Sequence, residues 1–224
     1  MLLTALNAAV GYEAVAHRVA HHSKAPPVPD PDPCRLTETQ RQAILNACTE
    51  PWLSQLVVVA LLTGLRQGEE LALSVQDVDF EGSRLWVRHT LTRTDGAYVL
   101  GEPKSSTSRR PVTLNEAALD ALRKAIASRH VECPIPDLIF TTARGQPRNG
   151  SVLTHRFQAA LAAASLPTLR WHDLRAAHGS WLLDTGTDIY TVSRRLGHRD
   201  VATTARFYGV VSEDLQRQAS DRLV

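Results

Sequence analysis

The chain has few cysteines and no long apolar run. The three cysteines, Cys34, Cys48 and Cys133, are odd in number and widely spaced, and no Cys-x-x-Cys pair is present. This pattern argues against a disulfide framework and against a zinc site. No apolar run reaches the roughly 18 residues that a membrane span needs, and the N-terminus lacks the basic start and apolar core of a secretory signal. We therefore expect an intracellular, cytoplasmic protein without a metal site or membrane segment.

An excess of charge of one sign is also missing. The 25 Lys and Arg residues nearly balance the 23 Asp and Glu residues, which leaves a formal net charge of +2. This balance does not by itself identify a nucleic-acid partner, so the placement of the charges matters. Two local basic clusters are present, Lys104 with Arg109 and Arg110, and Arg194-Arg195 with Arg199. On composition alone, each cluster is more typical of a solvated surface than of a binding site.

A proline-rich stretch predicts one domain boundary. Residues 23–35 contain Pro26, Pro27, Pro29, Pro31 and Pro33. Because proline fixes φ and removes a backbone donor, this stretch is expected to be an extended linker. Before it, the apolar periodicity of residues 1–22 predicts a single helix. After it, residues 36–224 are expected to form the main domain and its C-terminal tail.

The main domain is predicted to be mainly α-helical with a small antiparallel β-sheet, an α+β fold. Thr37 and Gln40 have the spacing of a capping box, and an apolar helix over residues 52–63 is followed by a short helix over 68–73. Strands are expected over residues 84–88, 97–100 and 110–114, with a hairpin turn at Asp95-Gly96. Further helices are expected over residues 115–130, 152–164, 172–184, 188–196, 201–210 and 213–222.

Three segments place cationic side chains where they could meet a phosphate. Arg66 follows Gly64 at a helix start, where its planar guanidinium group can bind phosphate oxygens. Lys104 lies between two predicted strands, at an expected hairpin tip. His172 and Arg175 are three residues apart, so they share one face of a helix. Taken singly, each arrangement is most often an ordinary feature of a protein surface.

A fourth segment makes the set specific. Leu196-Gly197-His198 ends a predicted helix, and Tyr208 follows one short helix later. A tyrosine is usually a packing residue, but generic packing requires neither Leu-Gly-His nor the Thr203-Thr204 pair. The ordered set Arg66, Lys104, His172-x-x-Arg175, Leu196-Gly197-His198 and Tyr208 resembles the signature of the tyrosine recombinases, the phage-integrase family. The resemblance extends from residue 36 to about residue 210.

The resemblance implies a catalytic-domain fold and a transesterification reaction on DNA. Tyr208 matches the family's nucleophile, which forms a 3′-phosphotyrosine; Tyr12, Tyr98 and Tyr190 are expected to be packing residues. Arg66 and Arg175 match the two arginines that bind the non-bridging phosphate oxygens. The energy of the cleaved bond is kept in the phosphotyrosine ester, so no nucleotide cofactor is expected. The sequence accordingly lacks a phosphate-binding Gly-Lys loop.

Proton transfers and DNA contacts are assigned by the same resemblance. His172 matches the residue that accepts the tyrosine proton, and Lys104 matches the general acid. His198 is expected to donate a hydrogen bond to the phosphate, and Glu69 to orient the site. We further expect DNA contacts from Arg109, Arg110 and Arg199. The expected partner is double-stranded DNA, on which family members assemble as tetramers, with accessory recombination factors as further candidate partners. The free chain is expected to be a monomer.

One departure from the family keeps two alternatives open. Typical members carry a separate helical DNA-binding domain before the linker, whereas residues 1–22 resemble only its last helix. The chain could therefore be a truncated integrase remnant that binds DNA, or full-length partners, without productive recombination. The other alternative is a type IB topoisomerase, although the His at position 172 favours recombinases.

Overall fold

The computed structural model describes residues 34–103 and 106–208, together with Ala9, Tyr12, Arg217, Ser220 and Asp221. The chain divides into two compact units, residues 1–31 and 32–224, with the boundary inside the proline-rich stretch. The helix expected within residues 1–22, most of the linker and the helix expected over 213–222 lie almost wholly outside the described residues. That division into helix, linker and catalytic domain therefore remains a prediction.

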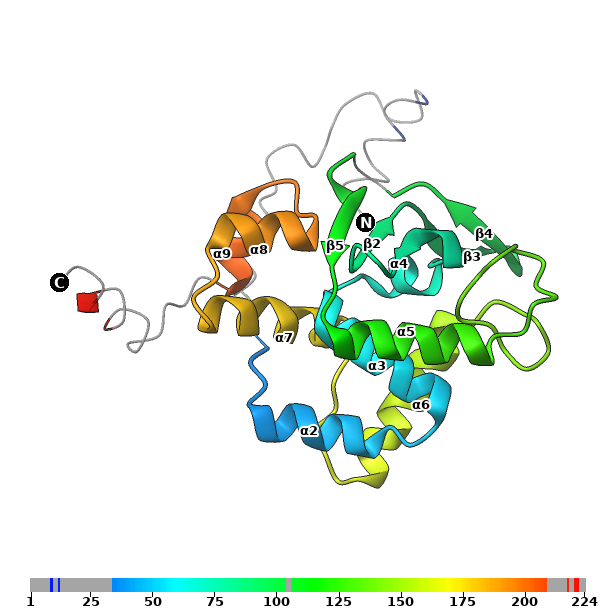
Figure 1. The fold of residues 1–224 in the computed structure, drawn as a ribbon, viewed down its shortest axis with the longest axis horizontal. Helices are drawn as coiled ribbons and strands as arrows, with labels where there is room; N and C mark the ends of the chain where they lie inside the picture. The colour runs from blue at the N-terminus through cyan, green and yellow to red at the C-terminus, as the bar shows by residue number, and fades with distance from the viewer. Residues whose placement is uncertain are drawn as a thin grey trace. The chain divides into compact units, whose positions relative to one another are not determined.

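The described part of the second unit is mainly helical (Figure 1). At its start, Thr37 forms the expected capping box, in which its hydroxyl group accepts from the Gln40 N–H and the Gln40 side chain accepts from the Thr37 N–H. The helices are α2 (Glu38–Ala47), α3 (Pro51–Thr63), α4 (Gln67–Leu71), α5 (Glu116–Ser128), α6 (Gly150–Ala163), α7 (Trp171–Asp184), α8 (Ile189–Leu196) and α9 (Val201–Tyr208).

The structure has two small antiparallel sheets, whereas the sequence predicted one. The first has the order β1 (Val78–Asp79), β2 (Arg84–Val87) and β5 (Arg110–Thr113). The second is a hairpin of β3 (Thr90–Thr94) and β4 (Ala97–Gly101).

The strand expected over residues 97–100 therefore does not pair with the strand at 84–88, and the expectation of one sheet was wrong in this respect. The reason is the turn at Asp95-Gly96, which joins Thr94 directly to Ala97. A two-residue turn pairs the residues on either side of it, so β4 must pair with the segment immediately before the turn. β4 and β5 consequently belong to different sheets, so the hairpin expected between them does not form, while Lys104 itself lies outside the described residues.

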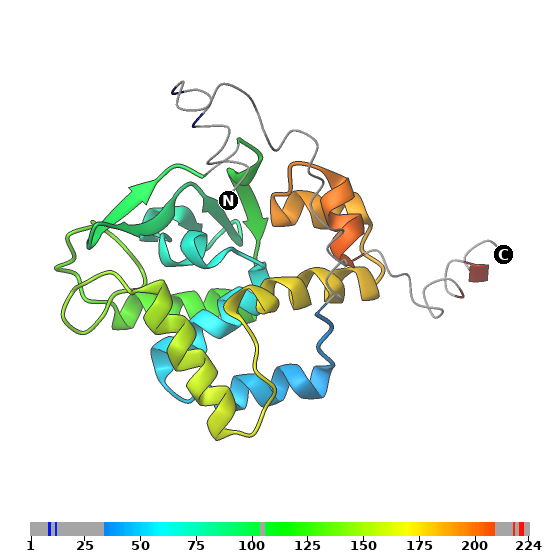
Figure 2. The same cartoon turned by 180° about the vertical axis from the view of Figure 1, so that it is seen from behind.

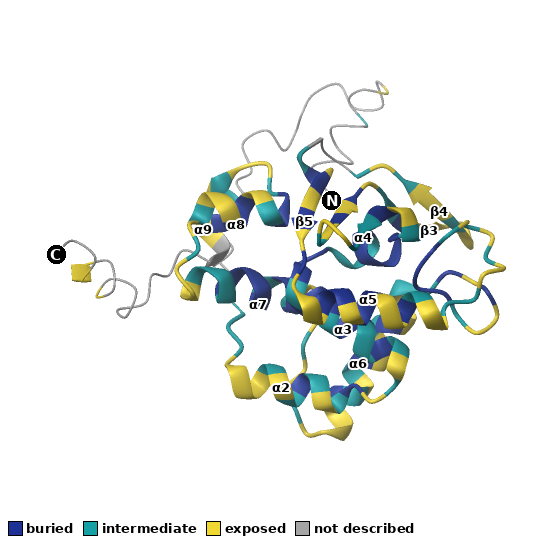
Figure 3. Ribbon diagram, viewed as in Figure 1, coloured by how far each residue is buried: buried dark blue, intermediate teal, exposed yellow. Residues whose placement is uncertain are grey.

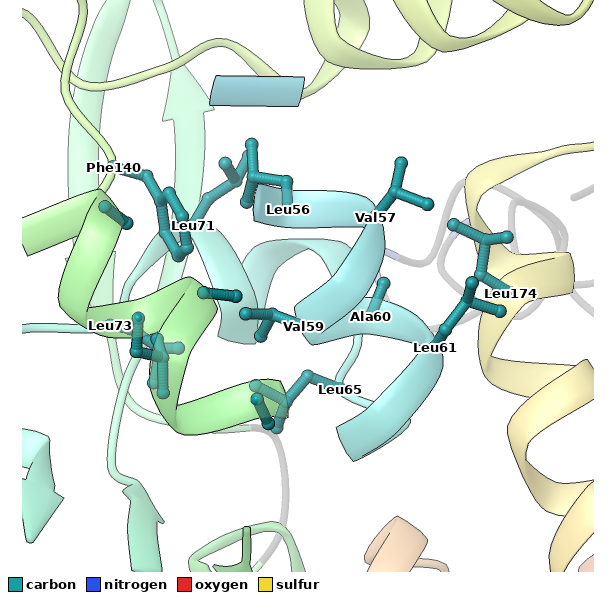
Figure 4. Packing of buried hydrophobic residues seen from close by; sticks show 14 of the residues in the cluster. Leu56, Val57, Val59, Ala60, Leu61, Leu65, Leu71, Leu73, Phe140 and Leu174 are labelled. Carbon is teal, nitrogen blue, oxygen red and sulfur yellow. The ribbon is translucent and has the colours of Figure 1, made fainter. Parts of the chain in front are cut away.

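Helix α3 lies at the centre of the apolar core. Its residues Leu53, Leu56, Val57, Val59 and Ala60 are all buried, as expected for a helix that is apolar on every side. Figure 1 shows α5 and α7 alongside α3, and Figure 4 shows side chains of α3 packed among those of neighbouring elements. Viewed from behind, α6 lies against α2 (Figure 2).

The burial of the residues agrees with this arrangement. In Figure 3 much of α3 is coloured as buried, whereas the outer faces of α2, α5 and α9 are coloured as exposed. The fold class expected from the sequence, mainly α with small antiparallel sheets, is confirmed.

Candidate active site

Arg66 is placed by the sharp end of α3. Gly64 ends this helix at φ +66°, a conformation that favours glycine, and a Cβ atom there would lie 2.6 Å from the His178 ring. The chain then turns into α4, with Arg66 as its N-cap residue. Glu69 accepts hydrogen bonds from the Arg66 backbone N–H at 3.0 Å and from Arg66 Nη1 at 2.6 Å. The Arg66 side chain remains 40% exposed, so it is accessible to a ligand.

Glu69 also binds a second, buried arginine. Arg110 Nη2 lies 3.1 Å from Glu69 Oε2, and both side chains are almost fully buried. Burial acts to raise the pKa of Glu69, but the charges and hydrogen bonds of Arg110 and Arg66 outweigh it and hold the pKa below its ordinary value. Glu69 is therefore a carboxylate that orients Arg66.

The position of Arg110 corrects the sequence-based expectation of a DNA-contacting side chain. Its Nε donates to the carbonyl oxygen of Arg195 at 2.6 Å, and its Nη1 donates to that of Ser108 at 2.9 Å. Residues of β5 alternate in burial, and Arg110 falls on the inward side of the strand. A basic cluster in the sequence does not reveal which of its members points inward.

Arg175 joins the ends of two helices. It is buried on α7, where its Nη1 donates to the carbonyl oxygen of Gly64 at 2.6 Å and its Nη2 donates to that of Leu196 at 2.6 Å. Arg66 Nη2 donates to the carbonyl oxygen of Gly197 at 3.4 Å. The last carbonyl groups of a helix have no partner within the helix and favour nearby cations. The two arginines therefore bring the ends of α3 and α8 together.

Two histidines lie beside these arginines. His198 follows Gly197, which ends α8 at φ +67°, and its Nδ1 lies 2.8 Å from the Thr204 hydroxyl group on α9. Burial, with the positive charges of Arg175 and Arg66 next in size, lowers the pKa of His198 to about 4.

His172 is in the first turn of α7, and its pKa is lowered by desolvation and then by Arg175. Both imidazoles are therefore predominantly neutral at pH 7, next to two permanent positive charges. Such a cluster favours an anionic ligand, because an anion offsets the repulsion among its members.

Two residues of this region were missed in the sequence. His178 is buried on α7, with Nδ1 2.7 Å from the Leu61 carbonyl oxygen and Nε2 accepting from Arg195 Nε at 3.0 Å. Burial, and then the charge of Arg195, lowers the pKa of His178 to about 3.

Arg195 Nη2 also donates to the carbonyl oxygens of Leu62 and Thr113, each at 3.0 Å. The spacing of His178 and Arg175, three residues apart on one helix, was an available signal, whereas nothing in the sequence distinguishes Arg195 from a solvated arginine. The following residues are called the arginine network below: Arg66, Arg110, Arg175 and Arg195, with Glu69 and His178.

Other expected site residues stand apart from the network or outside the described residues. Arg109 and Arg199 are exposed, and Arg109 forms an ion pair with Glu102. Lys104 lies outside the described residues. Tyr208 is the last residue of α9, and the placement of its side chain is outside what the structure describes. Tyr190, expected to be a packing residue, is instead 60% exposed on α8.

A pocket of about 560 Å³ opens beside His198, between β5 and α8. Its lining includes Arg109, Arg194 and Tyr190. A larger pocket, of about 710 Å³, lies away from the histidines, between the β3–β4 hairpin and the start of α6. In the described part of the chain, no helix is long and apolar enough to cross a membrane, and no three acidic, His or Cys side chains gather as metal ligands would.

Comparison with known families and proteins gives one consistent result. The model of the phage integrase family matches residues 34–213. The ICEBs1 integrase of Bacillus subtilis (strain 168) is 30% identical over 175 residues, which cover 74% of this chain and 46% of that protein. The integrase of Staphylococcus phage L54a is 29% identical over 198 residues, or 82% and 56% of the two chains. The chain thus spans about half the length of these curated relatives.

Solved structures show the same fold. The Tn1549 transposon integrase in complex with transposon right end DNA superposes with a TM-score of 0.77 at 25% identity, over 87% of this chain and 67% of that one. A lambda integrase dimer bound to a COC′ core site superposes with a TM-score of 0.62 at 17% identity, over 95% and 59% of the two chains. At the lower identity, the similarity concerns the fold alone.

Proposed function

The chain belongs to the phage integrase family, and on this premise we propose that it is a DNA strand transferase that cleaves and rejoins double-stranded DNA at specific sites. One observation carries the proposal: Arg66 and Arg175 donate to the carbonyl groups of Gly64, Leu196 and Gly197, where α3 and α8 end and His198 begins the next segment. The pKa of His172 is lowered by burial and then by Arg175 and Arg66, and the same two arginines act on His198. A phosphodiester is the anion that suits this cluster.

The proposed reaction is an in-line displacement at phosphorus. The Tyr208 oxygen forms a bond to phosphorus while the bond to the 5′-oxygen breaks, which leaves a 3′-phosphotyrosine and a free 5′-hydroxyl group. Charge builds up on the phosphate oxygens in the transition state, where fixed cations are most effective. Arg66 is the more accessible of the two arginines, whereas Arg175 is buried and contributes its charge from the junction of the two helix ends that it joins.

Two proton transfers complete the proposed reaction. The ordinary pKa of tyrosine is about 10, so the Tyr208 hydroxyl group needs a base. His172 is suited to accept that proton because its lowered pKa keeps it neutral. Lys104 is assigned as the acid that protonates the leaving 5′-oxygen. His198 is assigned to donate from Nε2 to the phosphate, which the Thr204 hydroxyl group supports if it donates to Nδ1 and so fixes the tautomer.

DNA binding and assembly are also part of the proposal. Arg109 and Arg199 are exposed and are assigned to the DNA backbone, whereas buried Arg110 is removed from this role. Full activity is proposed to require a tetramer on two DNA duplexes, and the free chain is proposed to be a monomer. The proposed reaction uses no nucleotide, since the phosphotyrosine ester keeps the energy of the cleaved bond, and no metal ion, since Arg66 and Arg175 are assigned to stabilise the charge on the phosphate.

The test is capture of the covalent intermediate. A library of duplexes with a randomised core and a nick beside it would be incubated with the protein, because a nick traps the cleaved strand. DNA that stays attached after denaturation would be recovered and sequenced, and peptide mapping would locate the attachment. We expect a single preferred core sequence attached at Tyr208. Absence of any adduct, or attachment elsewhere, would contradict the proposal.

Matched variants sharpen this test. Tyr208→Phe should form no adduct, while Tyr190→Phe, the exposed tyrosine on α8, should form as much as the parent chain. Arg66→Ala should slow single-turnover cleavage by about 10²–10³-fold, with a smaller loss of DNA binding. Equal losses of binding and cleavage would mean that Arg66 only holds the DNA. Efficient relaxation of plasmids that lack the recovered sequence would instead indicate the topoisomerase alternative.

A further inference from the structure

Glu70 is a buried acid that the proposed reaction does not use. It follows Glu69 on α4 but is completely buried. Its Oε2 accepts a hydrogen bond from the Trp171 indole N–H at 3.1 Å, and its Oε1 has no hydrogen-bond partner among the described residues. Burial raises the pKa of Glu70 well above its ordinary value, and the Trp171 hydrogen bond offsets only part of this effect. Burial therefore favours the protonated, neutral form of the Glu70 carboxyl group.

Stability alone does not explain a carboxyl group at this position. Adjacent α4 residue Leu71 belongs to the apolar core, and a buried polar atom without a partner disfavours the folded state. A leucine at position 70 would have a similar volume and no unpaired oxygen. The property that glutamate adds is a directional acceptor for one particular N–H group.

The hydrogen bond connects the two helices that carry the proposed catalytic groups. Glu70 is adjacent to Glu69, which binds Arg66. Trp171 is adjacent to His172, 101 residues further along the chain than Glu70.

The indole ring has a second contact, with an aromatic ring of α6. The Phe157 ring of α6 packs against it edge to face, with 5.3 Å between ring centroids and 78° between ring planes. Apolar packing alone permits small sliding movements, whereas a hydrogen bond to a ring fixed in this way sets the relative position of α4 and the start of α7.

We propose that Glu70 is a positioning residue, which sets the place of His172 relative to Arg66 by binding Trp171. The geometric part of this inference stands on the contacts above, and its catalytic consequence rests on the proposed function. Glu70 does not touch the DNA in this scheme. It acts only through Trp171, so changes in the Trp171 hydrogen bond should appear at His172.

The test compares Glu70→Leu with Glu70→Gln. Leucine removes the acceptor but keeps the volume, whereas glutamine keeps a neutral acceptor of the same shape. The NMR signals of the Trp171 indole N–H and of the His172 imidazole would be assigned by their loss in Trp171→Phe and His172→Ala. Urea unfolding would measure stability, and the trapped-adduct reaction would measure single-turnover cleavage on the recovered sequence.

We expect Glu70→Leu to be at least as stable as the parent chain, to shift both NMR signals, and to cleave at least tenfold more slowly. Glu70→Gln should keep the parent signals and restore most of the cleavage rate. Trp171→Phe removes the indole N–H group that donates to Glu70, so it should move the His172 signal as Glu70→Leu does. If Glu70→Leu does not fold, Trp171→Phe would be used in its place.

Two results would overturn the inference. One is an unmoved His172 signal in folded Glu70→Leu, whatever its cleavage rate. The other is a moved signal with unchanged cleavage, which would show that the placement of His172 by Glu70 does not matter for the reaction. If the parent chain forms no adduct, the proposed function fails, and the His172 signal still decides whether Glu70 places His172.

Discussion

Helix α3 takes part in two cores of opposite character. Its body packs in an apolar core through side chains such as Leu56 and Val57, as Figure 4 shows. Its C-terminal carbonyl groups, those of Leu61, Leu62 and Gly64, instead accept hydrogen bonds from the arginine network. Apolar contacts are non-directional and tolerate exchange among residues of similar size. The hydrogen bonds of the network are directional, so they fix positions.

The apolar core and the arginine network therefore have different roles: the core stabilises the fold, and the network positions the site residues. The apolar core supplies most of the driving force for folding, whereas the network holds Arg66 and His198 close to one another through the carbonyl oxygens of Gly64, Leu196 and Gly197. Mutations in the apolar core should therefore reduce stability and leave the folded fraction active. Mutations in the network should reduce activity even where stability is restored.

The largest expected effect comes from breaking the Glu69–Arg110 pair. Glu69→Ala leaves Arg110 buried without its partner and should lower the free energy of unfolding by roughly 3–5 kcal/mol. Leu56→Ala in the apolar core should cost a similar amount, roughly 2–5 kcal/mol. Denaturant unfolding would measure both variants. Single-turnover cleavage by the folded fraction should fall in Glu69→Ala and persist in Leu56→Ala.

An apolar replacement of this pair separates the two roles further. Glu69→Leu combined with Arg110→Met should regain most of the lost stability, because buried ion pairs are often replaceable by apolar residues. Cleavage should stay low, since Arg66 has lost the carboxylate that orients it. If the double variant cleaved as the parent chain does, the comparison between the two cores would fail.

A smaller, pH-dependent effect is expected at His178. Its pKa of about 3 in the folded protein lies below its ordinary value of about 6.5, so the unfolded chain binds the proton more readily. The resulting stabilisation is complete above pH 6.5 and is lost as the pH falls toward 3, at about 1.4 kcal/mol per pH unit. His198 acts in the same direction down to about pH 4.

The control for this prediction is an exposed histidine. The free-energy difference between the parent chain and His178→Asn should narrow as the pH is lowered from 6.5 to 4.5, as urea unfolding at each pH would measure. His155→Asn, at an exposed position of α6, is the control substitution, and its free energy of unfolding would be measured at the same pH values. A constant difference for His178→Asn would show that the folded protein binds a proton at His178 as readily as the unfolded chain does, which would contradict the lowered pKa.

The smallest expected effect distinguishes two glycines with positive φ. Gly96→Ala, in the β3–β4 turn, should cost roughly 1–2 kcal/mol from backbone strain alone, because no atom lies within 4 Å of its Cβ. Gly197→Ala should cost more, since its Cβ would lie 2.8 Å from Arg110 Nη1. Thermal unfolding would rank the two variants. Only Gly197→Ala should also slow cleavage, because it displaces the network next to His198.

The same contrast explains what the sequence could predict. Apolar periodicity, the Thr37 capping box and the glycine that ends α3 are local signals, and they led to most of the helices and to the position of Arg66. The pairing of β2 with β5 joins residues far apart in the chain, and no local pattern selects it. The burial of Arg110 and the role of Arg195 depend on carbonyl groups from distant helices. Residue type alone therefore did not reveal either role.

Arg175 also has a consequence for the order of folding. Its two carbonyl partners lie 111 residues before it and 21 residues after it, so these bonds form only when three distant segments have met. Closing loops of this length is entropically slow compared with forming local helices. The competent site should accordingly be assembled late, after the apolar core. A nascent or partly folded chain would then be unable to nick DNA, and a φ-value near zero for Arg175→Ala would be the kinetic evidence for this order.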